Sequence, residues 1–311
     1  MEQILSGYFV YMFSLLLMFI ALGTILHLQF GLTGIPNFGL SIFWGFGMYA
    51  FALLVLKLNF PFIPALIVAT ILTGLISWGL GRIILNLDSQ SILVASLAFL
   101  AIIEILITQE KWLTNGVMGI GPIAFPIDFG VYTKFAYFLI LLALTAILMF
   151  YAGRIHVSPY GRLILSIQDN EPLVQSLGKP TFRQKIIFFT VTCAIAGFFG
   201  AMAAPVYNFL FPKYIGAEVT FTIWIALILG SRKKLFGGLV GMLATIGLFD
   251  ILLETVVPIP EQNAVILYNA KYFLYGLTLV LVLMFRPSGI LGDKRRPINF
   301  KNTSKLEKRE G

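Results

Sequence analysis

Residues 153–185 read GRIHVSPYGRLILSIQDNEPLVQSLGKPTFRQK and form the longest polar stretch between two strongly apolar blocks of the chain. Ser158 followed by Pro159 predicts the start of a helix, because serine caps free N–H groups and a proline in the first turn needs no N–H partner. Apolar residues then recur at helical spacing on one side: Tyr160, Leu163, Ile164 and Ile167. This stretch is therefore predicted to be helical rather than a slack linker.

A second short helix is predicted to begin after Asp169 or Asn170, with Pro172 in its first turn. Gly178 is a natural left-handed stop for it. Two amphipathic helices in a loop between membrane spans have no core of their own, so their apolar sides must lie against something. The membrane surface, the neighbouring loops and a docked partner protein are all compatible with this pattern.

The composition places the chain among membrane proteins. Hydrophobic residues make up 59% of its 311 residues, charged residues 12%, and the mean hydropathy is +0.92. Soluble domains carry about a quarter charged residues. We expect an all-α polytopic membrane protein, with a single membrane domain over residues 1–292 and a polar tail over residues 293–311.

A membrane-spanning helix needs about 20 apolar residues. The predicted spans are 8–28, 40–56, 62–81, 91–109, 135–152, 186–211, 219–230, 235–257 and 265–285. The short and glycine-broken segments widen this count to about 8–10 helices, some of them broken or re-entrant. The N-terminus has no basic residue before its apolar run, so the first span is interpreted as retained rather than cleaved.

The basic residues predict the orientation. On alternate loops, seventeen lysines and arginines fall on the side of the 153–185 loop and of the C-terminus, and five on the opposite side. Because positive loops stay in the cytoplasm, both the loop and the C-terminus are predicted to be cytoplasmic in a multi-pass protein of the cell (inner) membrane. The net charge of +8 is then explained by topology, and no folded basic domain for nucleic acid is present.

Glycines and a proline interrupt the stretch Gly31–Ala50, which reads GLTGIPNFGLSIFWGFGMYA. Irregular backbone inside a membrane survives only where it is buried in protein or lines a wet cavity, and transporters hold polar solutes on such broken helices. Thr33, Asn37 and Ser41 are its polar groups and are candidates for a translocation path. Close helix packing through the small residues explains the glycines equally well.

Three further polar residues are candidates for the same path. Ser96 and Glu104 lie in the span after Gln90, and an acid inside a membrane usually faces a cavity or a partner, although Glu104 is near enough to the outer end to reach the interface. Asn115 lies in the outer loop 110–134, whose glycines and prolines predict a structured loop at an outer mouth.

No enzyme constellation is present in the sequence. His27 and His156 are placed on opposite sides of the membrane and are not expected to form a metal site or a triad. The chain contains no G-x-x-x-x-G-K-[ST] motif. A single cysteine, Cys193, excludes an internal disulfide. Transport driven by ATP would therefore need an ATPase on another subunit.

Six blocks in this order carry a family resemblance: GLTGIPNFGLSIFWGFGMYA (31–50), VASLAF (94–99) with Glu104, LTNGVMGI (113–120), SPYGRLILSIQDNEPLVQSLGKPTFRQKIIFF (158–189), AIAGFFGAMAA (194–204) and KYFLYGLTLVLVLMFRPSGILG (271–292). Together they resemble the membrane permeases of branched-chain amino-acid ABC importers, in particular the longer M-type subunit. The resemblance covers residues 31–292, nearly the whole membrane domain.

This resemblance implies an ABC-importer permease fold and a heteromeric importer. Its partners would be an extracytoplasmic substrate-binding protein, a second homologous permease and two ATPase subunits, which would hold ATP and Mg²⁺, while this chain would bind no cofactor and catalyse no reaction. The loop 158–185 would supply the helices that couple to the ATPase. The residues carried over to that role are Arg162, Asp169, Asn170, Glu171, Leu177 and Gly178.

Other functions compete with a branched-chain or neutral amino-acid importer. A urea or short-amide ABC importer is the nearest, because its permeases look similar. A stand-alone secondary transporter would normally carry a charged cluster at mid-membrane, whereas the acids here lie toward the outer ends. A purely structural subunit is a further alternative, against which the broken Gly31–Ala50 stretch argues.

Overall fold

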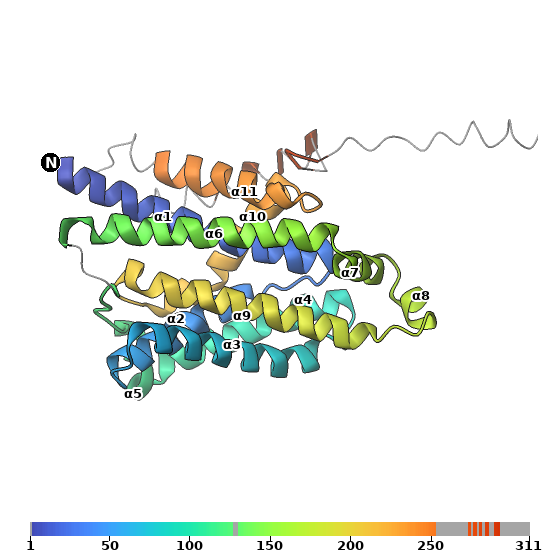
Figure 1. The fold of residues 1–311 in the computed structure, drawn as a ribbon, viewed down its shortest axis with the longest axis horizontal. Coiled ribbons are helices and arrows are strands. Elements are labelled where there is room, and N and C mark those ends of the chain that lie inside the picture. Colours follow the sequence, from blue (N-terminus) through green and yellow to red (C-terminus); the bar gives the residue numbers. More distant parts are fainter. Residues whose placement is uncertain are drawn as a thin grey trace, which may run out of the picture.

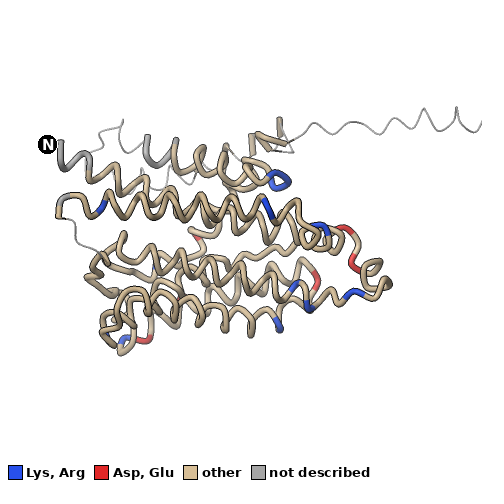
Figure 2. The backbone as a smooth tube through the Cα atoms, in the orientation of Figure 1, with Lys and Arg blue, Asp and Glu red and all other residues tan. Residues whose placement is uncertain are grey.

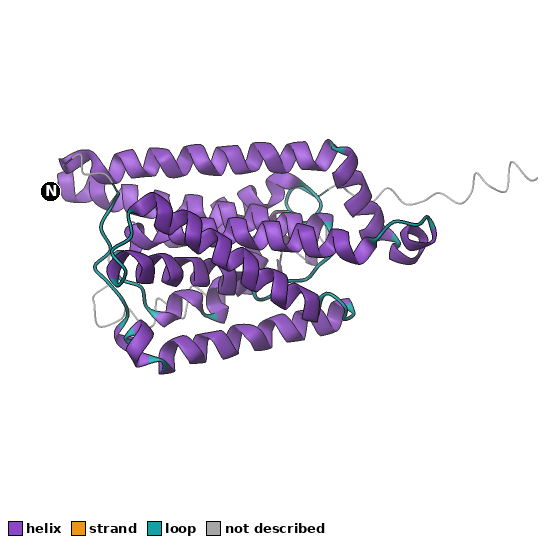
Figure 3. Ribbon diagram, turned by 60° about the horizontal axis from the view of Figure 1, so that its bottom comes forward, coloured by secondary structure: helices purple, strands orange, loops and turns teal. Residues whose placement is uncertain are grey.

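The computed structural model describes residues 2–126, 130–252, 273–274, 276–278, 280–281, 284–285 and 289–292. Its elements are α1 (Glu2–Leu26), η1 (His27–Leu32), α2 (Leu40–Leu56), α3 (Phe62–Ile84), α4 (Ser89–Gln109), α5 (Lys111–Thr114), η2 (Gly116–Met118), η3 (Gly130–Tyr132), α6 (Thr133–Val157), α7 (Pro159–Asp169), α8 (Glu171–Ser176), α9 (Thr181–Tyr207), η4 (Pro212–Ile215), α10 (Ala217–Gly230), α11 (Leu235–Met242) and η5 (Leu243–Leu252). Figure 3 shows that the described fold consists of helices joined by loops.

The predicted all-α membrane architecture is confirmed. Six helical segments within the described ranges are long and apolar enough to cross a membrane, and two shorter apolar helices, Leu40–Leu56 and Leu235–Gly247, accompany them. The first eight predicted spans each correspond to one of these segments. The ninth, 265–285, falls largely outside the described residues, as does the polar tail 293–311.

The long helices run side by side, and α7 and α8 project from one end of the bundle (Figure 1). Most of the lysines and arginines drawn in Figure 2 gather at that same end. Arg82 lies in the last turn of α3, and Arg154 lies in the last turn of α6, the helix that leads into α7. The described helices therefore carry their positive charge where the amphipathic loop lies.

α9 lies at the centre of the bundle, against both α2 and α3. A Cβ atom added at Gly200 would lie 1.9 Å from the Trp44 carbonyl oxygen, and one added at Gly47 would lie 2.1 Å from the Gly197 carbonyl oxygen. These backbones touch because a glycine stands on at least one side of each contact, and small residues are how helices associate tightly in a membrane. The packing interpretation of the glycines is therefore confirmed at Gly47.

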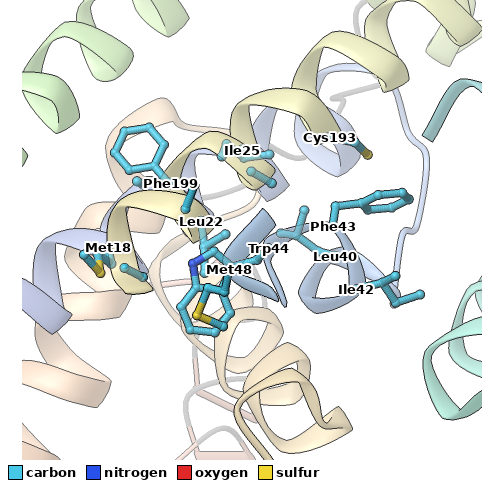
Figure 4. Close-up of a cluster of buried hydrophobic side chains, with 14 of the residues drawn as sticks. Met18, Leu22, Ile25, Leu40, Ile42, Phe43, Trp44, Met48, Cys193 and Phe199 are labelled. Atoms are coloured by element: carbon cyan, nitrogen blue, oxygen red, sulfur yellow. The ribbon is translucent and has the colours of Figure 1, made fainter. Parts of the chain in front are cut away.

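A continuous apolar core joins α1, α2 and α9. Figure 4 shows Leu22 and Ile25 of α1, Trp44 and Met48 of α2 and Phe199 of α9 gathered together, all of them buried. α3, α4 and α6 instead expose many apolar side chains, such as Ile71, as expected for helices that face lipid.

The turn between α3 and α4 is held by a helix cap. The hydroxyl of Ser91 donates to the Asp88 carboxylate at 2.7 Å, and the Ser91 backbone N–H donates at 3.3 Å. These two hydrogen bonds hold the pKa of Asp88 below its usual value. The cap starts α4 at Ser89, two residues before the predicted span.

At the other end of the bundle, the described part of the predicted outer loop that precedes residue 127 is bonded to the rest of the fold. Ile120 and Leu210 exchange two backbone hydrogen bonds of 3.0 and 2.9 Å, which tie this loop to the segment after α9. The hydroxyl of Tyr49 also donates to the Leu210 carbonyl at 3.3 Å. This part of the loop is therefore tied to the segment after α9, which is in turn bonded to α2.

Candidate translocation path and coupling loop

The first span ends in a π-helical turn and an irregular segment. η1 continues α1 to Leu32, and the backbone from residue 33 to 39 is not helical before α2 begins at Leu40. Gly34 has φ of +73°, a conformation that favours glycine. The predicted break within Gly31–Ala50 is therefore confirmed, and it is preceded by a π-helix, a form often found at functional sites.

Gln29 is the centre of a buried polar network at this break. Its side-chain nitrogen donates to the Thr192 hydroxyl at 2.9 Å and to the Cys193 sulfur at 3.2 Å. Its side-chain oxygen accepts from the Asn37 amide at 3.0 Å. The Gln29 backbone carbonyl accepts from the Thr33 hydroxyl. Gln29 is completely buried, so this one amide joins η1, the irregular segment and α9.

The irregular segment is also bonded to α4 and α10. The backbone N–H of Phe38 donates to the Ser96 hydroxyl at 3.0 Å, and the Trp224 indole donates to the Asn37 carbonyl at 3.2 Å. One turn further, the Thr220 hydroxyl donates to Ser41 at 2.7 Å. Buried backbone groups that leave a helix need such partners in a membrane.

Aromatic rings line the segment on the α10 side. The Phe38 ring stacks on Trp224 with centroids 4.2 Å apart, and the Phe30 ring lies 4.6 Å from the same indole. The break thus places amide and hydroxyl groups beside a cluster of aromatic faces. Neither set carries a formal charge.

Four of the six predicted path residues, Thr33, Asn37, Ser41 and Ser96, are brought together around the break. The other two are not. Glu104 lies farther along α4, where its carboxylate would be 3.3 Å from a Cβ atom at Gly216. Asn115 is exposed in the outer loop with φ of +58° and joins the short helices α5 and η2. The sequence thus identified the residues of the break but could not separate them from two polar residues toward the outer side.

The prediction of two amphipathic helices at residues 158–178 is confirmed. The Ser158 hydroxyl accepts from the Gly161 N–H at 3.0 Å and starts α7, and the Asn170 side chain accepts from the Leu173 N–H at 3.1 Å and starts α8. Gly178 ends α8 with φ of +75°. The second cap is Asn170, because Asp169 is the last residue of α7.

The apolar stripe of α7 and one residue of α8 are buried against the bundle. Ile164, Ile167 and Val174 form one cluster with Leu28 and Leu32 of η1, together with Ala152 and Phe188. Tyr160 packs at its edge, and burial raises the pKa of this tyrosine. The sequence left the membrane surface, the neighbouring loops and a partner protein open, but the buried stripe lies on none of these: it packs on η1, α6 and α9 of the same chain.

The predicted coupling residues lie on the surface of this loop that faces away from the helix bundle. Arg162, Asp169, Asn170 and Gly178 are exposed, and Leu177 is 71% exposed although it is apolar. Glu171 is half-buried and forms an ion pair with Lys185 at 2.9 Å. The exposed residues of this set are available to a partner, and the ion pair joins the start of α8 to the N-terminal part of α9.

The predicted separation of the two histidines is wrong. His27 Nε2 lies 2.9 Å from His156 Nε2, and the rings are stacked. α1 and α6 lie side by side, and η1 carries His27 to the level of the last turn of α6. No third His, Cys, Asp or Glu completes a metal-binding group with them within the described ranges.

Sequence reasoning missed Gln29. A polar amide inside the first apolar run, two residues before the glycine-rich stretch, was the available signal. Its importance depends on Thr192, which lies 163 positions away.

Comparisons with known proteins agree with this architecture. The family model described as "Branched-chain amino acid transport system / permease component" matches residues 7–283, most of the chain. The chain belongs to this family. It is therefore a multi-pass permease subunit of an ABC importer.

The permease is similar to two proteins named as branched-chain amino acid transport permeases. It is 26% identical to the high-affinity branched-chain amino acid transport system permease protein LivM of Escherichia coli, over 93% of this chain and 71% of the relative. It is 23% identical to the probable LivM permease of Methanocaldococcus jannaschii, over 86% of this chain and 89% of the relative. No solved structure matches the permease.

Proposed function

We propose that this permease moves branched-chain or other neutral amino acids across the membrane along the broken segment between η1 and α2. The observation that carries the proposal is the buried network around Gln29 and Asn37. Transporters hold polar solutes at interrupted helices, where backbone and uncharged side-chain groups meet the solute. The rings of Phe38 and Trp224 would suit an aliphatic side chain, and the neighbouring amides and hydroxyls would suit a zwitterion.

The proposed assembly contains this chain, a second homologous permease, two ATPase subunits and an extracytoplasmic binding protein. ATP and Mg²⁺ would be bound by the ATPase subunits, and this chain would bind no cofactor and hydrolyse no nucleotide. The named similarity to LivM permeases supports the amino-acid substrate. Binding energy from the solute's main-chain charges would come from helix ends and backbone dipoles.

The loop 158–185 is proposed to couple transport to ATP hydrolysis. Its outer surface carries Arg162, Asp169, Asn170, Glu171, Leu177 and Gly178, and the apolar Leu177 side chain is exposed on a polar loop. Leu173, four residues earlier, is exposed as well, and neighbouring exposed apolar side chains rimmed by polar groups are typical of a docking surface. The positive charge at this end of the bundle supports a cytoplasmic position for the loop. We propose that the C-terminus is cytoplasmic as well.

The function can be tested by reconstituting the complete importer in lipid vesicles. We expect ATP-dependent uptake of labelled leucine, isoleucine or valine, and no ATP-dependent uptake by this chain alone. Uptake of labelled urea or a short amide, with none of the amino acids, would replace the amino-acid substrate by the nearest alternative. Uptake by the purified single chain would contradict an ABC subunit.

The coupling role has its own test. Glu171→Gln and Gly178→Ala should insert normally in the membrane but lower the uptake supported by ATP hydrolysis. Gly178 has positive φ and open space around it, so its replacement strains the end of α8 without a clash. Normal uptake in both variants would remove the coupling assignment.

A further inference from the structure

The coupling loop and the polar network meet at one short element, η1. On its loop-facing side, Leu28 and Leu32 pack in the cluster that holds Ile164 and Ile167 of α7. On its bundle-facing side, Gln29 bonds to α9 and to the irregular segment. One π-helical turn therefore touches both the proposed ATPase-coupling surface and the proposed solute path.

Gln168 of α7 holds the end of this turn. Its side-chain amide is assigned with its nitrogen toward the carbonyl oxygens of Leu32 and Gly31, at 3.1 and 3.2 Å, because the opposite orientation would face these two acceptors with the amide oxygen. The last carbonyls of a helix have no partner within the helix, and in a buried position they need one from elsewhere. Gln168 provides it from a different helix.

The residues around the Gln168 contact are closely packed, so the end of η1 has little room to move. A Cβ atom at Gly34 would lie 2.9 Å from Gln168 Cγ, and a Cβ atom at Gly31 would lie 2.5 Å from the Arg232 carbonyl oxygen. The Arg232 guanidinium also lies over the Phe30 ring at 4.8 Å. The end of η1 is thus enclosed by α7 on one side and by the basic turn after α10 on another.

A π-helical turn joins residues five apart by its hydrogen bonds, whereas an α-helical turn joins residues four apart, and the π form is rare. Such an unfavourable conformation persists where the surrounding structure fixes it. Return of η1 to α-helical register would rotate its side chains about the helix axis. Gln29 lies only two positions before Gly31, so this rotation would withdraw its amide from Asn37 and Thr192.

We propose that Gln168 is a positioning residue that transmits movement of the coupling helix α7 to the solute path through the register of η1. With its amide on the two carbonyls, η1 is held in π-helical form and the Gln29 network is closed. Movement of α7 withdraws the amide, η1 changes register and the network opens. This inference rests on the proposed coupling role of the loop.

The experiment uses the complete importer in vesicles and measures molecules of amino acid taken up per ATP hydrolysed. Gln168→Met keeps the length of the side chain and removes the donor, whereas Gln168→Lys keeps a donor. Gln90→Met is the matched control, because Gln90 is an exposed glutamine in the first turn of α4, away from η1. A ratio of uptake to hydrolysis is independent of how much protein is folded.

We expect Gln168→Met to lower this ratio about tenfold, within the usual range of coupling between sites, while ATP hydrolysis continues. Gln168→Lys should recover most of the ratio and Gln90→Met should leave it unchanged. The effects of Gln168→Met and Gln29→Leu should also be non-additive, because both act on one network.

Three results would overturn the proposal: an unchanged ratio in Gln168→Met, no recovery in Gln168→Lys, or full additivity with Gln29→Leu. The variants Glu171→Gln and Gly178→Ala distinguish a failure of the Gln168 proposal from a failure of the proposed coupling role of the loop. If they lower the ratio and Gln168→Met does not, only the role of Gln168 is wrong. If all three leave it unchanged, the coupling role of the loop is wrong as well.

Discussion

Replacing Gln29 by methionine tests whether its network stabilises the folded permease. Methionine has nearly the same length and is apolar, so the substitution removes the hydrogen bonds with little change in volume. Thr24→Val is the matched control on the same helix. Thr24 is also buried, but its hydroxyl only donates to the Ile20 carbonyl, one turn earlier in α1, at 2.9 Å.

The expected effect follows from the contacts that are lost. Gln29 takes part in three side-chain hydrogen bonds of 2.9, 3.2 and 3.0 Å. At about 0.6 kcal/mol each for a hydrogen bond between membrane helices, they contribute about 2 kcal/mol. The buried Asn37 amide also loses its partner, which adds roughly 1 kcal/mol. Gln29→Met should therefore lower the free energy of unfolding by about 2–3 kcal/mol.

The measurement is reversible unfolding of the purified permease in mixed micelles, followed by circular dichroism as the denaturing detergent is increased. Thr24→Val should change the free energy of unfolding by well under 1 kcal/mol, because its hydroxyl bonds only within its own helix. An equal loss of stability in the two variants would refute the reasoning, since the connections between helices would then contribute nothing beyond one local bond.

Three further perturbations have expected outcomes. Gly200→Ala should lower the free energy of unfolding by roughly 2 kcal/mol or more, because its Cβ atom would meet a backbone carbonyl at 1.9 Å, whereas Gly79→Ala in open space should not; micelle unfolding compares them. Because the folded-state pKa of Asp88 lies below its ordinary value of 3.8, its cap stabilises fully above that value. Asp88→Ala should therefore lower stability at pH 7, and unfolding at decreasing pH should show this difference vanish as the pH falls through the folded-state pKa. Glu171→Gln breaks a partly exposed ion pair with Lys185 and should lower the free energy of unfolding by less than about 1 kcal/mol, so a large loss of uptake in vesicles would reflect coupling and not unfolding.

The coupling helices were accessible to sequence reasoning because their signals are local. Ser158 and Asn170 cap the helices that follow them, and Gly178 supplies the left-handed end. Each of these acts over three or four residues. The sequence could not predict what the apolar stripe of these helices packs against. Its partner, η1, is more than a hundred residues earlier in the chain.

The histidine pair shows where such reasoning ends. His27 and His156 are 129 positions apart, and assigning spans one by one placed them on opposite sides. Their contact depends on how far η1 extends α1 and on the packing of α1 beside α6. Neither is encoded in the residues around either histidine.

The amino-acid sequence by itself determined that this chain is an α-helical membrane protein, where most of its spans lie and where the helix before α2 breaks. Apolar runs, caps and glycines act on neighbouring residues, so they can be interpreted in order along the chain. Only the tertiary structure decided that Gln29 joins the break to α9 and that Gln168 closes η1. Those bonds exist because separate helices pack at van der Waals distance, and the partners of a buried amide are chosen by that packing.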